Sequence, residues 1–168
     1  MDPMMKSSLW QQFGAAIDML DDAIRLCPQS LWTAQLWKDP DEPAYGQVWY
    51  VAYHTLSWLD LYLGGDYDSF VPPPPFVRGQ LPNEPYTKAQ ILTYLRDVRS
   101  RCQSTIEAMT DERAQQICTF DWVEVPYWEL QLYTMRHTQE HASQINMLLG
   151  QHDVAGLDWV TIARNGNS

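Results

Sequence analysis

Three of the four histidines have the residue type and spacing of ligands in an open metal site. His137 and His141 lie four residues apart in a predicted helix, so their Cβ atoms share one helix face, about 5–6 Å apart. His54 lies in a second predicted helix, whereas His152 lies beyond the helix stop at Gly150. The sequence therefore predicts that His54, His137 and His141 bind one divalent metal ion.

The periodicity of both helices predicts that these imidazoles point inward. One helix carries a series spaced by three and four residues: Leu130, Thr134, His137, His141, Ile145 and Leu148. The other carries a similar series: Val51, His54, Trp58 and Leu61. A buried polar group without a partner costs about 1–3 kcal/mol, so three inward imidazoles need partners. A hydrogen bond from each imidazole to a buried carbonyl or hydroxyl is the alternative to a shared metal ion.

Three neutral imidazoles leave at least one coordination position of the ion open. Zinc would acidify a water molecule there to a pKa of about 7, or a substrate thiolate could take the position. Such sites suit Zn²⁺ or Ni²⁺ and accept Fe²⁺, whereas a di-iron bundle needs Glu-x-x-His pairs that this sequence lacks. We expect four nearby side chains to line the pocket around the ion: Tyr50, Trp58, Tyr133 and Gln144.

The run from His137 to His141 also has the H-x-x-E-H pattern of inverted zinc metallopeptidases. Those enzymes use a further glutamate ligand downstream, and no glutamate follows Glu140 in this chain. The sequence therefore disfavours a peptidase. Glu140 remains the candidate catalytic residue, either as a general base or as a hydrogen-bond partner of a ligand. A solvated or salt-bridged glutamate is its simpler interpretation.

Four long segments have helical periodicity. They cover residues 10–27, ended by Pro28; about 44–63, ended by Gly64-Gly65; 87–109, opened by a capping box; and 126–150. A long proline-rich connection, 66–86, joins the second helix to the third and includes Pro72–Pro75 as a stiff spacer or a lid. Part of the link 110–125 alternates weakly. These features predict an all-α fold, an antiparallel four-helix bundle, in a single domain over residues 1–168.

The composition argues against several classes of function. A formal net charge of −10, with only 11 Lys and Arg, argues against a nucleic-acid-binding surface. No apolar run reaches the length of about 18–20 residues that a membrane span needs, and the amino terminus lacks a signal-peptide pattern. We therefore expect a soluble, cytoplasmic protein. Cys27, Cys102 and Cys118 are widely spaced, which indicates reduced core thiols.

The order of three motifs resembles that of the DinB/YfiT-like proteins. The motifs are the run Tyr53-His54-Thr55-Leu56-Ser57-Trp58-Leu59-Asp60, the pair His137-x-x-x-His141 followed by Ser143-Gln144-Ile145, and the tail Gly156-Leu157-Asp158-Trp159. The resemblance covers nearly the whole chain in element order. It implies a four-helix bundle, usually dimeric, that holds a divalent metal through His54, His137 and His141. Relatives of known chemistry resemble thiol S-transferases and a thiol-dependent isomerase, which use a low-molecular-weight thiol activated at the metal, and many others have no assigned activity.

Two functions agree with these residues. The first is a metal-dependent enzyme of thiol S-transferase or hydrolase type, whose metal activates a thiol or water toward a small-molecule substrate. The second is a non-catalytic, stress-related bundle that binds a metal or another ligand. A structural zinc site usually has four protein ligands, so three ligands favour the enzyme. The resemblance and the many aromatic residues also predict a homodimer.

Overall fold

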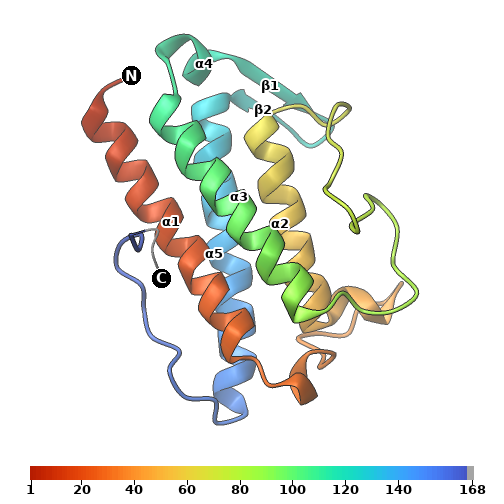
Figure 1. The fold of residues 1–168 in the computed structure, drawn as a ribbon. Coiled ribbons are helices and arrows are strands. Elements are labelled where there is room, and N and C mark those ends of the chain that lie inside the picture. The colour runs from red at the N-terminus through yellow and green to blue at the C-terminus, as the bar shows by residue number, and fades with distance from the viewer. Residues whose placement is uncertain (166–168) are drawn as a thin grey trace.

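The computed structural model describes residues 1–165 and is mostly helical (Figure 1). Four long helices make up most of it: α1 (Pro3–Leu26), α2 (Val48–Gly64), α3 (Lys88–Ala108) and α5 (Tyr127–Gln151). The shorter elements are the 3-10 turns η1 (Gln29–Leu31) and η2 (Pro43–Gly46), helix α4 (Asp111–Gln115), and strands β1 (Ile117–Phe120) and β2 (Val123–Pro126). The prediction of a mostly helical fold is confirmed, with a small antiparallel sheet in addition.

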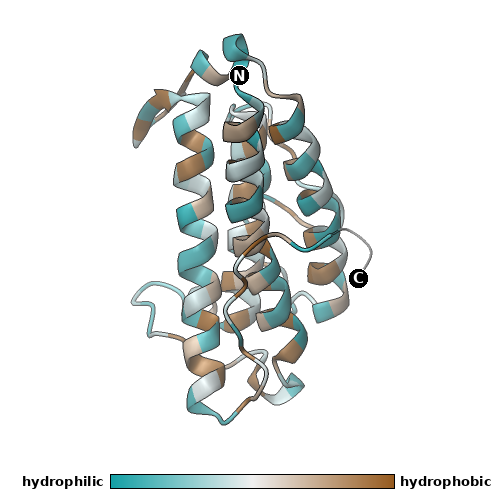
Figure 2. Cartoon of the chain, turned by 90° about the vertical axis from the view of Figure 1, so that its left-hand side faces the viewer, coloured by the Kyte–Doolittle hydropathy of each residue, from teal (hydrophilic) through white to brown (hydrophobic). Residues whose placement is uncertain are grey.

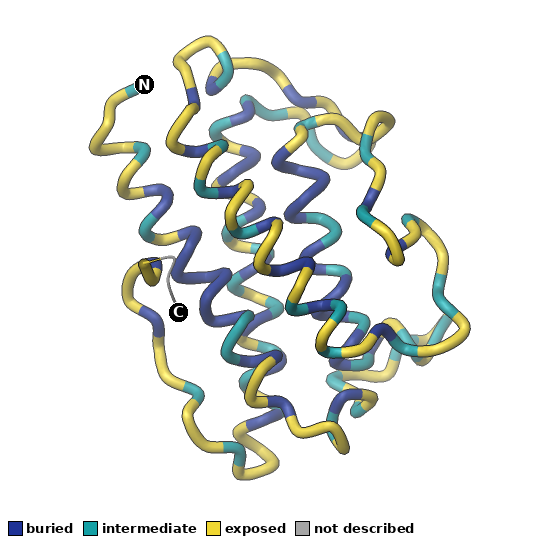
Figure 3. Tube along the Cα trace, viewed as in Figure 1, coloured by how far each residue is buried: buried dark blue, intermediate teal, exposed yellow. Residues whose placement is uncertain are grey.

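The long helices lie side by side, and α3 and α5 each pack against both α1 and α2 (Figure 1). Polar and apolar residues alternate around the helices (Figure 2), and buried positions face the neighbouring helices (Figure 3). Each long helix contributes fully buried side chains to one core, among them Phe13, Leu56, Ile91 and Leu130. Burying one such side chain contributes about 1.5–3 kcal/mol, so the amphipathic pattern drives this packing.

The local signals for helix ends are confirmed at two places. The Thr87 hydroxyl accepts the backbone N–H of Gln90, and the Gln90 side chain accepts the backbone N–H of Thr87, which is a complete capping box. Helix α2 ends where Gly65 adopts a φ of 77° and donates its N–H to the Leu61 carbonyl. Both ends therefore follow from residue chemistry alone.

Several helix boundaries differ from the predicted ones. Helix α1 begins at Pro3, seven residues before Trp10, and α5 continues through the predicted stop at Gly150 to Gln151.

The starts of α2 and α5 also differ. Residues 44–46 belong to η2, and α2 begins only at Val48, because the Gly46 carbonyl accepts from Leu36 and Gln47 forms a bridge with Gln35. Pro126 precedes α5 as its N-cap because it ends β2 with an extended ψ of 147°, paired with Ile117. In both cases a contact with a distant segment holds the backbone out of the helix.

The weakly alternating part of residues 110–125 forms the β1–β2 hairpin, preceded by the short helix α4. The proline-rich residues 66–86 form no helix or strand and pack against α2 and α3. Phe76 stacks on Tyr53 and Tyr94, with ring centroids 5.4 and 4.8 Å apart, and the Tyr53 hydroxyl donates to the Val77 carbonyl at 3.1 Å. This segment is therefore anchored by aromatic side chains.

The segment after α5 runs back along α1 (Figure 1). Ala163 donates its N–H to the Gln11 carbonyl at 2.9 Å, and Arg164 donates its N–H to the buried Asp18 carboxylate at 2.7 Å. Arg99 of α3 donates to both oxygens of Asp18, at 2.7 and 3.1 Å. One buried carboxylate therefore joins α1, α3 and this tail.

The three cysteines are free thiols in the core, which confirms that prediction. Burial raises the pKa of Cys27 and, more strongly, that of Cys102, so both are protonated at neutral pH. Within residues 1–165, no helix is both long enough and apolar enough to cross a membrane.

The adjacent glycines at the end of α2 give a matched test of its cap. Gly65→Ala is expected to lower the free energy of unfolding by about 1–2 kcal/mol, because its positive φ disfavours a Cβ. The new Cβ would also lie 3.1 Å from Cys118 Sγ. Gly64→Ala meets nothing within 4 Å and is expected to stabilise α2 by up to about 1 kcal/mol. Urea denaturation of both variants measures the difference, and equal effects would contradict this role of Gly65.

Candidate metal centre

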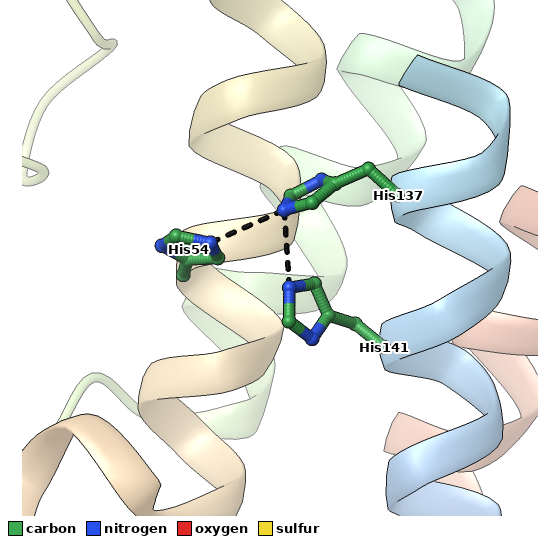
Figure 4. A group of neighbouring side chains, drawn as sticks. All are labelled: His54, His137 and His141. Atoms are coloured by element: carbon green, nitrogen blue, oxygen red, sulfur yellow. Dashed lines mark hydrogen bonds between the residues drawn. The ribbon is translucent and has the colours of Figure 1, made fainter. Parts of the chain in front are cut away.

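The packing of α2 against α5 brings the three predicted ligands together. His54 comes from α2, and His137 and His141 come from α5 (Figure 4). His137 Nε2 lies 3.2 Å from His54 Nε2 and 3.0 Å from His141 Nε2. Nitrogen atoms of all three imidazoles lie within 4.8 Å of one another, so the group could hold a metal ion.

These separations match those between ligands of a single ion. Metal–nitrogen bonds of about 2.0–2.1 Å place neighbouring ligand nitrogens about 2.8–3.0 Å apart in octahedral and about 3.3–3.4 Å apart in tetrahedral geometry. The two Nε2 separations of His137, 3.0 and 3.2 Å, lie between these limits. Among residues 1–165, no carboxylate or thiol joins the group, so one or more coordination positions remain for an exogenous ligand.

Hydrogen bonding alone does not satisfy this arrangement. Each imidazole nitrogen carries either one N–H or one lone pair in the ring plane, yet His137 Nε2 faces two other Nε2 atoms. The opposite nitrogen, His137 Nδ1, is buried and has no hydrogen-bond partner. A cation between the rings would accept all three Nε2 lone pairs at once, so the donor set fits a metal ion better than it fits a hydrogen-bonded core.

Gln144 orients one of the ligands. His141 Nδ1 lies 2.7 Å from Gln144 Oε1, an acceptor, so Nδ1 carries the proton and Nε2 presents its lone pair to the group. The Gln144 amide in turn lies 3.5 Å from Glu140 Oε1. Partners of this kind fix the tautomer and direction of metal-ligating histidines in general.

His54 and His137 are uncharged at neutral pH, which prepares them for metal binding. Burial, followed by the proximity of His137 and His141, lowers the pKa of His54 to about 3. Burial and the proximity of His141 lower the pKa of His137 to about 4. Both imidazoles are therefore neutral at neutral pH and available as ligands.

The histidines face one another between α2 and α5 (Figure 4), although they are less buried than some of their neighbours. His54, His137 and His141 are only half-buried, whereas the adjacent Thr55 and Thr138 are fully buried. The threonines tolerate burial because each hydroxyl donates to the carbonyl four residues earlier, at 2.7 and 3.0 Å. The buried stripe is consequently rotated toward the threonines, and the imidazoles lie at its edge.

Two small cavities flank His54, and they contain three of the expected pocket residues. One, of about 300 Å³, is lined by Trp58, Tyr62, Trp122 and Tyr133 together with His54 and His137. The other, of about 240 Å³, is lined by Trp37, Asp39, Tyr45, Tyr50 and Val51 together with His54 and His141. Sequence reasoning missed the residues that come from the connection before α2 and from the hairpin, since no periodicity relates them to the histidines.

The structure places Glu140 outside this group. Glu140 is exposed and lines a third cavity, of about 620 Å³, between α1, α5 and the tail residue Trp159. His137 also lines that cavity, but the carboxylate of Glu140 reaches the histidines only through Gln144. The Glu140 carboxylate is therefore placed to support Gln144 and not to act as a base at the open coordination position of the metal.

The first prediction concerns the ligands. Alanine substitution of His54, His137 or His141 is expected to weaken metal binding by at least about 100-fold, because two imidazoles hold an ion poorly against water. Gln144→Met, which removes only the orienting acceptor, is expected to weaken it about 10- to 100-fold. Competition with a chromophoric chelator measures both effects. The control is His152→Ala, an exposed histidine outside the group, and loss of binding there as well would contradict the assignment.

The second prediction concerns acid stability without metal. Between about pH 6.5 and pH 3 the unfolded chain protonates His54 whereas the folded protein does not. The free energy of unfolding is therefore unaffected by His54 above its unfolded pKa of 6.5, and it falls as the pH drops below that value. In a chelator, His54→Gln is therefore expected to show a smaller fall in Tm from about pH 7.5 to about pH 5 than the wild type. An unchanged slope would contradict the lowered pKa.

The site agrees with the match of this chain to a known family. Comparison with curated proteins finds no match. The sequence model of the DinB superfamily matches residues 12–145, a span that contains all three histidines and most of the four long helices. The chain therefore belongs to the DinB superfamily.

Proposed function

We propose that this protein is a metal-dependent enzyme in which a divalent ion held by His54, His137 and His141 activates a small nucleophile. The observation that carries the proposal is the convergence of three Nε2 atoms without a fourth protein ligand among residues 1–165. Structural zinc sites usually have four protein ligands, whereas catalytic sites keep a position open. A donor set of three histidine nitrogens without a thiolate favours Zn²⁺ or Ni²⁺, with Fe²⁺ as the third candidate.

The reaction type that fits best is transfer to, or hydrolysis of, a small electrophile. The bound ion would supply Lewis acidity at the open position, lowering the pKa of a thiol or a water molecule. Around it, the half-buried histidines and the aromatic side chains of both cavities would limit the access of bulk water. Gln144 would hold His141 in its ligating tautomer, with Glu140 supporting Gln144.

The scaffold belongs to the same proposal. We take α1, α2, α3 and α5 to be the antiparallel four-helix bundle expected of the family, in a single domain, with the proline-rich residues 66–86 as the connection between its second and third helices. We also propose that the protein acts in the cytoplasm as a homodimer. Exposed apolar side chains outside the histidine cavities offer surface for such contact, including Met4, Met147, Trp159 and Ile162.

Cobalt replacement tests the proposed open position. Co²⁺ bound to the three histidines is expected to change its visible spectrum when azide or 2-mercaptoethanol is added, because either ligand would enter the inner coordination shell. Removing the metal is expected to lower Tm by only several degrees, since the helices have their own apolar core.

The opposite result would identify the non-catalytic alternative. A cobalt spectrum indifferent to both additions, together with loss of helicity after chelation, would mean that the ion is structural. The His141→Ala variant serves as the control, because a spectral change that survives there would come from cobalt bound elsewhere.

A further inference from the structure

The cavity on the Tyr50 side of His54 combines three aromatic rings with one carboxylate. Its outer wall is formed by Trp37, Asp39, Tyr45 and Tyr50, and its inner wall by the ligand histidines. Its volume of about 240 Å³ is below the usual range of drug-sized ligand pockets, about 300–1,000 Å³. The cavity therefore fits a small molecule or one end of a larger one.

The aromatic rings are held by the chain around them. The centroids of Tyr45 and Tyr50 lie 4.7 Å apart, and Trp49 packs edge-on against Tyr50 at 5.6 Å. Trp37 is positioned by a close backbone approach, since a Cβ on Gly46 would lie 2.1 Å from the Trp37 carbonyl oxygen. Trp37 and Tyr45 are each 37% exposed, so they form the rim of an open cavity.

The carboxylate is fixed in place and lacks a cationic partner. Asp39 Oδ1 accepts the backbone N–H groups of Asp41 and Glu42, both at 3.1 Å. Within residues 1–165, Asp39 Oδ2 has no hydrogen-bond partner and no Lys or Arg forms an ion pair with Asp39. The neighbouring Lys38 is exposed and does not line the cavity. A negative charge therefore remains at the rim, with one oxygen free.

We propose that this cavity binds a small organic cation, an ammonium or quaternary ammonium group, against Trp37 and the packed pair of Tyr45 and Tyr50 and beside Asp39. Aromatic faces carry negative electrostatic potential and attract such cations, and the carboxylate adds to the attraction. In the metal-free protein, an anionic group at the rim would meet the charge of Asp39 with no lysine or arginine in the lining to offset the repulsion. A bound divalent ion would attract anions only at the histidine end of the cavity.

The position of this cation site suggests that it binds part of the substrate of the proposed enzyme. This role rests on the proposed function. His54 and His141 line the same cavity, so a molecule whose cation lies against the rings would extend its other end toward the histidine group. The second cavity beside His54 has four aromatic side chains and no carboxylate, which suits an uncharged group. The enzyme would thus favour substrates whose cationic end lies at the rim beside Asp39 and whose other end, nearer the metal ion, carries no positive charge.

The test compares choline with 3,3-dimethylbutan-1-ol, its uncharged isostere, by calorimetric titration of the metal-free protein. Choline is expected to bind about tenfold more tightly than the alcohol, because only choline carries the charge. Asp39→Asn keeps the Oδ1 acceptor of the turn and removes the charge, and it should weaken choline binding about tenfold. The matched control, Asp41→Asn, should leave binding unchanged.

A second pair of variants covers the aromatic wall. Trp37→Leu should reduce choline affinity, whereas Trp159→Leu, which lies at the separate α1–α5 cavity, should not. Equal binding of choline and the alcohol, no detectable choline binding, or an Asp39→Asn variant with wild-type affinity would each overturn the cation site. The choline titration needs no metal, so its failure would refute only the cation site. A cobalt spectrum that does not respond to thiol or azide would instead refute the proposed enzyme.

Discussion

The packing of α2 against α5 is the constraint on which the candidate site depends. It places one imidazole from α2 opposite two from α5, and the two distances from His137 Nε2 to the other Nε2 atoms are those of neighbouring ligands around one ion. Burial lowers the pKa of His54 and His137, and the proximity of the neighbouring imidazoles lowers both further, so these two rings are neutral at neutral pH. Hydrogen bonds cannot pair all of these converging nitrogen atoms, whereas one metal ion can bind them together. The packing of the two helices therefore creates the chemistry of the site.

The rest of the site follows from what covers the two sides of His54. The connection between α1 and α2 brings Trp37, Asp39 and Tyr45 to one side, while the β1–β2 hairpin brings Trp122 to the other. The connection has little regular structure, yet backbone contacts hold it, such as the bond from the Leu36 N–H to the Gly46 carbonyl. Loops fixed on a rigid helical scaffold are where binding residues are commonly found. The different polarity of the two sides would distinguish the two ends of a ligand.

The buried ion pairs have a separate, structural role. Asp18 joins α1, Arg99 and the backbone of the tail, and Asp60 of α2 accepts from Tyr94 and Arg101 of α3. Each carboxylate is nearly inaccessible to solvent, and each has a guanidinium partner, as a buried charge requires. None of these residues lines either cavity beside His54, so the ion pairs support the scaffold without entering the site.

The sequence by itself determined the helical fold and the three candidate ligands. The capping box at Thr87, the glycine at position 65 and the i, i+4 pair of histidines depend on short-range geometry, which the order of residues encodes directly. The tertiary structure decided how deeply each side chain is buried: Thr55 and Thr138 are fully buried, with their hydroxyls bonded to their own helices, and the histidines are less buried. It also decided the cavity walls, since Trp37, Asp39 and Trp122 meet the histidines only through contacts between segments far apart in the chain, which no local periodicity can encode.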